Sequence, residues 1–353
     1  MQTISVKDFG LASGEVLPEM TVAYRTLGRL DPGGTNAVLV LHGYTTGPAM
    51  LDAGANVAEG SWSDLVGPGK AIDSDRHFVI CPNMLGSSYG STGPGSRNPA
   101  TGKHYGLDFP RITLEDIVNA QKALLDALGV NSLEAVAGPS FGAYQAFQWA
   151  VGHPSMVRRV VAAVGAPYNP GSAGSSQAIV DKLAAAPGWE NWREHGDQAS
   201  MLATLTAMRI HTLTTYGVDA ELTPAIPDPA ERAARIAELA REWAMGFNPG
   251  SLVTLMQAAE SFDLRPRLAA IEAPVMLVMS RTDAVFSPAL ARELASIPAT
   301  RNWSYVELDS EKGHFASGAD AALWADQLHS FMNTEPAAWI AHGLPLAPTP
   351  ESP

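Results

Sequence analysis

The chain has 353 residues, of which 46% are hydrophobic, and this is enough apolar material for one large α/β domain or two smaller ones. Its 23 Lys and Arg residues against 36 Asp and Glu residues give a formal net charge of -13, which argues against nucleic acid or an anionic membrane surface as the main partner. A single cysteine, Cys81, excludes an intrachain disulfide and a zinc site built on paired cysteines, and we expect no metal and no other cofactor.

The first residues, MQTISVKDFG, lack the basic and then apolar run of a signal peptide. No apolar stretch approaches the roughly 20 residues that a membrane-spanning helix needs. We therefore expect a cytoplasmic protein.

Short apolar runs alternate with helical patterns along the chain, which is typical of parallel strands joined by crossover helices. One segment, TLEDIVNAQKALLDALG, predicts a helix capped by Thr113, with Asp116 in its first turn and Gly129 at its end. Most of the runs are apolar on both faces, as a parallel sheet covered by helices requires. The predicted strands are residues 37–43, 77–83, 133–138, 157–165, 273–280 and 303–309.

This alternation stops between residues 167 and 266, where ASMLATLTAMRIHTLTTYG, DPAERAARIAELAREWAMGF and GSLVTLMQAAESF predict helices and no strand is evident. We interpret the region as a helical lid over the carboxyl edge of the sheet, where open α/β folds bind ligands. The predicted organisation is a core in two parts, residues 1–166 and 267–335, the lid, residues 167–266, and a proline-rich C-terminal tail, residues 336–353.

The pattern Gly-x-Ser-x-Gly occurs twice, around Ser140 and around Ser88. In a nucleophile elbow, a serine with this pattern occupies a strained turn between a strand and a helix. An apolar strand precedes Ser140 and the helical segment FGAYQAFQWAVGHP follows it, whereas GSTGPGSRNPATG after Ser88 cannot form a helix. We therefore predict that Ser140 is the nucleophile, with a plain turn serine as the alternative, and that Ser88 is a loop residue.

A serine hydroxyl becomes a good nucleophile when a base takes its proton, and an acid must orient that base. Asp283 and His314 each follow a predicted strand, in the order serine, acid, histidine that is expected for such an elbow. Asp309 is a rival acid, and its alternative role is to cap a strand end. Of the nine histidines, His314 alone is both late in the chain and in a glycine-containing turn after a strand.

A serine of this kind also needs backbone N–H groups that stabilise an oxyanion. We expect one donor to be the N–H of Phe141, directly after the nucleophile. The other should come from the loop LHGYTTG after the first predicted strand, where Tyr44 and Thr45 are the candidates.

Several longer segments resemble the homoserine O-acetyltransferase family. SWSDLVGPGKAIDSDRHFVICPNMLGSSYGSTGP, NPATGKHYGLDFPRITLEDIVNAQKALLDALGV and FGAYQAFQWAVGHP carry the resemblance, and IEAPVMLVMSRTDAVFSP and GHFAS extend it to about residue 333. It implies an α/β-hydrolase fold with a mostly parallel central sheet and an inserted helical lid, a homodimer through the lid, and a serine that carries an acyl group. The resemblance supports Ser140, Asp283 and His314, and it maps a substrate-contacting arginine onto Arg209, for which the alternative is a solvated helix charge.

Two positions depart from the family pattern. Phe141 is bulkier than the methionine that usually follows the nucleophile, and Phe315 replaces an aspartate that usually meets the amino group of homoserine. A site that loses this charged partner is expected to reject a substrate that depends on it.

We therefore predict the hydrolysis of small, short-chain carboxylic esters through an acyl-enzyme on Ser140, with a small ester as ligand and neither nucleic acid nor a membrane as partner. The alternative is an O-acyltransferase that moves an acetyl group from acetyl-CoA to homoserine or another alcohol. A binding or scaffold protein would not need a serine, an acid, a histidine and an oxyanion loop in this order.

Overall fold

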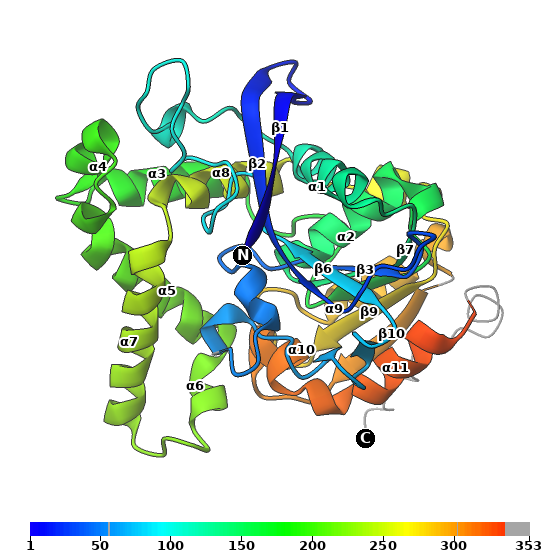
Figure 1. The fold of residues 1–353 in the computed structure, drawn as a ribbon. Helices are drawn as coiled ribbons and strands as arrows, with labels where there is room; N and C mark the ends of the chain where they lie inside the picture. Colours follow the sequence, from blue (N-terminus) through cyan, green and yellow to red (C-terminus); the bar gives the residue numbers. More distant parts are fainter. Residues whose placement is uncertain (56, 302, 336–353) are drawn as a thin grey trace.

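The computed structural model describes residues 1–335 except 56 and 302, and an eight-stranded sheet forms its centre (Figure 1). The strands are β1 (Gln2–Gly10), β2 (Val16–Leu27), β3 (Ala37–Val40), β6 (Phe78–Pro82), β7 (Leu133–Pro139), β8 (Val160–Ala163), β9 (Val275–Ser280) and β10 (Trp303–Leu308). Their order is β1-β2-β6-β3-β7-β8-β9-β10. The six strands from β6 to β10 in this order pair in parallel, whereas β2 pairs antiparallel with both β1 and β6. A separate small ladder joins β4 (Val66–Gly67) and β5 (Ile72–Asp73).

Helices cover both faces of this sheet. Alternate residues of a strand point to opposite faces, so Leu39 of β3 packs with the first face, and Val38 and Val40 pack with the second. These three side chains are fully buried, as expected for a parallel sheet covered on both faces. The first face carries α1 (Leu114–Leu128), α2 (Phe141–Gly152) and α9 (Ala289–Ala295), and the second carries α10 (Ala316–Ala319) and α11 (Ala325–Asn333).

The start and end of α1 follow from local sequence signals. The Thr113 side chain accepts the Asp116 backbone N–H, and the Asp116 carboxylate accepts the Thr113 N–H at 2.8 Å, which makes a complete capping box. Gly129 ends the helix with φ 76°, a left-handed conformation that glycine adopts without strain. The helix predicted from these residues is confirmed.

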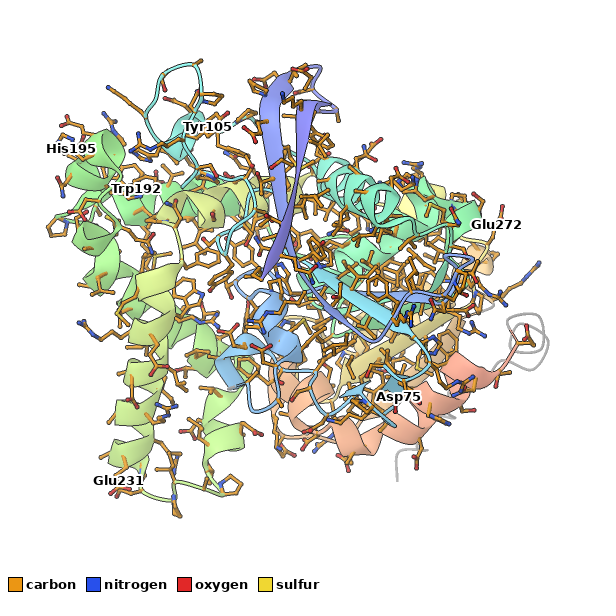
Figure 2. The ribbon with its side chains drawn as sticks, viewed as in Figure 1. Asp75, Tyr105, Trp192, His195, Glu231 and Glu272 are labelled. Carbon is orange, nitrogen blue, oxygen red and sulfur yellow. The ribbon has the colours of Figure 1, made fainter. Side chains whose placement is uncertain are left out.

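Six helices fill the chain between β8 and β9 and stand beside the sheet (Figure 1). They are α3 (Ser175–Ala184), α4 (Trp189–His195), α5 (Leu202–Tyr216), α6 (Val218–Leu222), α7 (Pro229–Gly246) and α8 (Pro249–Glu260). Residues 164–274 are all described and contain no strand. These helices have a core of their own, in which Trp192 and Phe247 are fully buried. Figure 2 shows Glu231 of α7 at the far end of this layer, and Glu272 on the opposite side of the molecule.

The sequence predicted all six parallel strands, but it missed β1 and β2. The observed strands are shorter at several ends; for example, the strand predicted at residues 157–165 is limited to β8, Val160–Ala163. The boundaries of the predicted lid stay predictions, and residues 336–353 of the predicted tail lie outside the described residues. Among the described residues, no helix is both long enough and apolar enough to cross a membrane.

Candidate active site

A sharp turn joins β7 to α2, and Ser140 occupies it. Ser140 has φ 57° and ψ -120°, a backbone conformation that costs on the order of 1–3 kcal/mol for a residue other than glycine. Its N–H donates to the Ala163 carbonyl at 2.9 Å. A Cβ would lie 2.6 Å from the Leu41 carbonyl oxygen at Gly138 and 2.2 Å from it at Gly142. Both glycines of the pattern are therefore required. The segment therefore has the strained strand-to-helix geometry that its pattern predicted.

Asp283 and His314, in the loops after β9 and β10, form a buried hydrogen-bonded pair. Oδ2 of Asp283 lies 2.8 Å from Nδ1 of His314, and the two side chains are 0% and 5% exposed. Oδ1 of Asp283 accepts the backbone N–H groups of Val285 and Phe286 at 2.7 and 3.1 Å, which fixes the carboxylate. The carboxylate selects the tautomer with its proton on Nδ1 and leaves Nε2 as a base. Nε2 is buried and has no hydrogen-bond partner among the described residues.

Two aromatic rings contact His314. The ring centroid of Tyr216, the last residue of α5, lies 4.6 Å away, and Phe286 stacks at 5.7 Å. Burial raises the pKa of the Tyr216 hydroxyl, so that it stays neutral near pH 7. Sequence reasoning gave neither ring a role, because their contacts with His314 depend on tertiary packing: Tyr216 comes from α5, and Phe286 comes from the loop after β9.

The rival candidates lie in other settings. Asp309 forms an ion pair with Arg281 at 2.7 Å, and its side chain is 87% exposed, so it does not orient His314. The Ser88 hydroxyl accepts the Asn248 backbone N–H at 2.8 Å in a loop without helix or strand. Asp283, and not Asp309, is the carboxylate bonded to His314, and the catalytic roles of Asp283 and Ser140 stay predictions.

The predicted oxyanion donors lie on both sides of Ser140. Phe141 is the first residue of α2, and its N–H has no acceptor inside the helix. Tyr44 and Thr45 lie in the loop after β3 and line the same cavity as Ser140. The Tyr44 and Phe141 rings stack with their centroids 6.0 Å apart, whereas the Thr45 hydroxyl accepts a hydrogen bond from Arg209. These contacts involve side chains, so the backbone N–H groups of Tyr44 and Thr45 both stay candidates for the second donor.

Arg209 of α5 is almost completely buried, with 2% exposure, so the alternative of a solvated helix charge is wrong. Its Nη1 donates to Thr45 Oγ1 at 2.6 Å, its Nη2 donates to the Ala58 carbonyl, and its guanidinium lies 5.0 Å from the Trp243 ring centroid. Burial lowers the pKa of Arg209, while the group remains a cation near pH 7. Its Nε has no hydrogen-bond partner, and it forms no ion pair among the described residues. Arg209 lines the cavity that also holds Ser140, and a buried cation in a cavity wall is suited to an anionic ligand group.

Two cavities meet at Ser140. The smaller has a volume of about 40 Å³ and is lined by His314, Arg209 and Phe315 among others. The larger has a volume of about 270 Å³ and mostly apolar walls. Ser140, Tyr44 and Tyr216 line both cavities, and the larger one adds Phe141, Tyr144, Asn169, Pro170, Gly171, Ser175, Met256, Ala259, Val285 and Phe286.

Phe315 is buried, and its ring lies 5.8 Å from that of Tyr216. It lines the small cavity and also a third cavity of about 230 Å³, whose other walls include Asp64 and Glu221. Its side chain is therefore a wall that the two cavities share. Among the described residues, no group of three or more His, Cys, Asp or Glu side chains is arranged to hold a metal ion.

Comparison with known proteins agrees with this geometry. The profile of the alpha/beta hydrolase fold family matches residues 36–319. The chain is 34% identical to a homoserine O-acetyltransferase from Symbiobacterium thermophilum over 91% of each chain. The crystal structure of esterase E22 superposes with a TM-score of 0.82 and 26% identity, covering 94% of this chain and 99% of that one. A homoserine O-acetyltransferase structure from Bacillus anthracis superposes with a TM-score of 0.80 and 24% identity, covering 95% and 98%, and shares the fold.

The site and the sheet thus define an α/β-hydrolase fold protein. Within that fold, the chain belongs to the homoserine O-acetyltransferase family. Both the predicted fold class and the resemblance noted in the sequence are confirmed.

The predicted main function, hydrolysis of small carboxylic esters, is wrong. Relatives at 33% and 34% identity that cover over nine-tenths of this chain are named homoserine O-acetyltransferase, and the esterase neighbour is less similar. That prediction gave too much weight to Phe141 and Phe315. These rings line cavity walls and leave the serine, the histidine and the carboxylate in place, so their presence does not favour water over an alcohol as the acyl acceptor.

Proposed function

We propose that this enzyme transfers an acetyl group from acetyl-CoA to the hydroxyl of a small alcohol, and that the alcohol is homoserine, as in the names of the curated relatives. The observation that carries the proposal is the pair of cavities that meet at Ser140. The two substrates reach Ser140 in turn, and two cavities on this residue allow the donor arm and the acceptor to approach it from different sides. The larger apolar cavity suits the thioester arm of the donor, and the small cavity with Arg209 suits a small anionic acceptor.

In the first half-reaction, Oγ of Ser140 attacks the thioester carbonyl carbon while Nε2 of His314 takes the hydroxyl proton. A C–O bond forms, and the tetrahedral intermediate then collapses as its C–S bond breaks. The proton moves from Nε2 to the leaving sulfur, so coenzyme A departs as a thiol and the acetyl group stays on Ser140. Asp283 orients the imidazole and stabilises its charged form without taking the proton. The 2.8 Å bond between Asp283 and His314 supports this role.

In the second half-reaction, the acceptor hydroxyl gives its proton to Nε2 of His314 and attacks the acetyl carbon. The bond from that carbon to Oγ of Ser140 breaks, and Oγ receives the proton from Nε2. The product is the acetyl ester of the acceptor, and the enzyme returns to its starting state. Both tetrahedral intermediates carry a negative oxygen, for which we assign the N–H groups of Phe141 and Tyr44 as donors.

Arg209 is assigned to the carboxylate of the acceptor. Its buried guanidinium lines the cavity beside Ser140 and forms no ion pair among the described residues, and a bound carboxylate would add a direct counter-charge to the longer-range effect of Glu59, which opposes the lowering of the Arg209 pKa by burial. Phe315 forms the apolar wall of the same cavity and limits the length of the acceptor.

The proposal is tested by incubating the protein with acetyl-CoA in the presence and absence of homoserine. Release of the coenzyme A thiol is followed with a thiol reagent, and the acetylated product is identified by mass spectrometry. We expect thiol release to depend on homoserine and one O-acetylhomoserine to form for each thiol released. Thiol release at the same rate without homoserine, with acetate as the only acetyl product, would contradict the proposal.

A further inference from the structure

A buried histidine, which the proposed reaction does not use, holds the loop that follows β3. His42 is completely buried; its Nε2 accepts the Met84 backbone N–H at 3.2 Å, and its Nδ1 lies 2.9 Å from the Gly43 carbonyl oxygen. Because an N–H donor faces Nε2, the ring proton lies on Nδ1 and is donated to Gly43. Burial lowers the pKa of His42 to about 4, although its bond to Gly43 acts in the opposite direction, so the ring is neutral near pH 7.

The bond from His42 acts on the peptide group between Gly43 and Tyr44. The Gly43 carbonyl also accepts the N–H and the hydroxyl of Thr46, each at 3.4 Å, so three donors hold its oxygen, and His42 makes the shortest of these bonds. In a trans peptide the C=O and the N–H point in opposite directions. Fixing this carbonyl toward the His42 ring therefore points the Tyr44 N–H, the proposed oxyanion donor, away from that ring.

A chain of side-chain donors fixes the preceding peptide group. Nε1 of Trp149 donates to Gln121 at 2.7 Å, and Nε2 of Gln121 donates to Gln145 at 2.6 Å. Nε2 of Gln145 then donates to the carbonyls of His42 and Phe141 at 3.1 and 3.2 Å. The indole N–H can only donate, so it sets the orientation of each amide along the chain. All three donor side chains are buried.

We propose that His42 and Gln145 are positioning residues that hold two successive peptide groups of the oxyanion loop. Gln145 fixes the peptide between His42 and Gly43, and His42 fixes the peptide between Gly43 and Tyr44. A donor held in place before the substrate arrives needs no reorganisation during the reaction. Neither side chain lines the two cavities at Ser140, so each acts through the backbone. The inference rests on the proposed function for the identity of the reacting serine.

The acylation half-reaction provides the test, with p-nitrophenyl acetate as the probe and release of p-nitrophenol as the signal. Loss of one oxyanion donor costs about 10²- to 10³-fold in rate. In His42→Leu and Gln145→Met the donor is misplaced and not lost, so we expect kcat to fall between about tenfold and 10²-fold while KM stays unchanged. A small alkyl trifluoromethyl ketone, which adds to the serine hydroxyl and forms a tetrahedral oxyanion, should lose affinity by the same factor. A role in folding alone would not weaken this inhibitor.

Two further variants sharpen the test. His42→Asn keeps a short side-chain amide that is able to donate to the Gly43 carbonyl, and we expect it to recover most of the rate that His42→Leu loses. Gln148→Met removes a buried glutamine of α2 that makes no hydrogen bond to the loop, and its rate should stay within about threefold of wild type.

A folded His42→Leu or Gln145→Met protein within about threefold of the wild-type rate would overturn the inference. A loss that appears in KM and melting temperature, while the ketone binds as before, would overturn it as well. If His42→Leu does not fold, the rate and the ketone affinity of Gln145→Met test the inference in its place. A wild-type protein that shows no acylation at Ser140 contradicts the proposed function itself, and this outcome is distinct from active wild type with unaffected variants.

Discussion

Two loops of this protein carry the same Gly-x-Ser-x-Gly pattern and place the serine in different surroundings. Ser140 lies in a strained turn between β7 and α2 and lines the two cavities described above. Ser88 lies in an irregular loop, where its hydroxyl accepts the N–H of Asn248, the residue that caps α8. We propose that the first serine is kept free for chemistry, whereas the second holds the start of α8.

The two loops also need their glycines for different reasons. At Gly138 and Gly142 there is no room for a Cβ beside the Leu41 carbonyl, because strand and helix approach closely. Gly86 and Gly90 instead have φ values of 83° and 104°, which other residues adopt only with strain. The pattern itself is thus uninformative, and the elements on either side of it decide what the serine does.

Replacing Ser140 gives the largest expected effect. Ser140→Ala removes the atom that carries the acyl group, and because the groups of such a site act as a unit, we expect acetyl transfer to fall by roughly 10⁵ to 10⁶. The variant should melt close to the wild-type temperature, since the change removes one hydroxyl and no packed apolar group. Thiol release from acetyl-CoA in the presence of homoserine measures the effect, and more than a tenth of the wild-type rate in a folded variant would exclude this serine from the reaction.

Ser88→Ala is the matched control for that comparison. The Asn248 N–H loses its acceptor, so we expect a loss of about 1–3 kcal/mol in the free energy of unfolding with activity close to wild type. Denaturant unfolding and the same thiol assay separate the two effects. A Ser88→Ala variant that is fully stable but inactive would reverse the roles assigned to the two loops.

The second prediction concerns Asp283, the proposed acid that orients His314. Asp283→Asn should reduce kcat by about 10⁴, because an amide no longer selects the tautomer with the proton on Nδ1 of His314. Asp309→Asn is the control, since its ion pair with Arg281 is exposed, and such pairs contribute about 0–1 kcal/mol. If Asp309→Asn proves the more damaging change, the assignment of the acid is wrong.

Many features of the fold and the candidate site could be predicted from the sequence. The parallel strands, the α1 cap and the positions of Ser140, Asp283 and His314 follow from local patterns, because each lies next to a strand or helix whose signal spans few residues. The antiparallel pair β1 and β2 was missed. In β1 the apolar residues alternate with polar ones on an exposed edge, so no buried apolar run marks the strand.

The rest of the site depends on tertiary contacts between distant segments. Nothing near Arg209 in the sequence shows that the guanidinium is buried against Trp243, 34 residues later, and bonded to Thr45, 164 residues earlier. Likewise, His42 resembles an ordinary strand-end residue until Met84 and Gly43 are seen on its two nitrogens. Reaction type was misjudged for a related reason, since one altered wall residue says little about which acceptor a shared acyl-enzyme uses.

The third prediction distinguishes the roles of the two cavities in the two half-reactions. Arg209→Lys keeps a positive charge but loses the planar fork, so the KM for homoserine should rise between about tenfold and 10²-fold, while acylation by acetyl-CoA changes little. The control Arg235→Lys alters an arginine of α7 that is paired with Glu238 near the surface. Steady-state rates at varied homoserine give the first quantity, and single-turnover thiol release gives the second. An equal loss in both half-reactions would contradict the assignment of Arg209 to the acceptor.

The smallest expected effect is a change in acceptor length. Phe315 forms a wall between the small cavity of about 40 Å³ and the neighbouring cavity of about 230 Å³, so Phe315→Ala should join them. The buried ring also packs on Tyr216, and its loss should cost about 3–5 kcal/mol of stability. Leu323→Ala, at a side chain that is 46% exposed, is the apolar control.

The expected change in selectivity follows from the size of the joined cavity. One methylene in a tight pocket is worth roughly 10- to 200-fold in selectivity. We expect the lower end here, so that kcat/KM shifts by about tenfold toward an alcohol one carbon longer than homoserine. Rates for the two alcohols, measured at a temperature where the variant stays folded, test this; an unchanged ratio would mean that Phe315 stabilises the lid contact without limiting the acceptor.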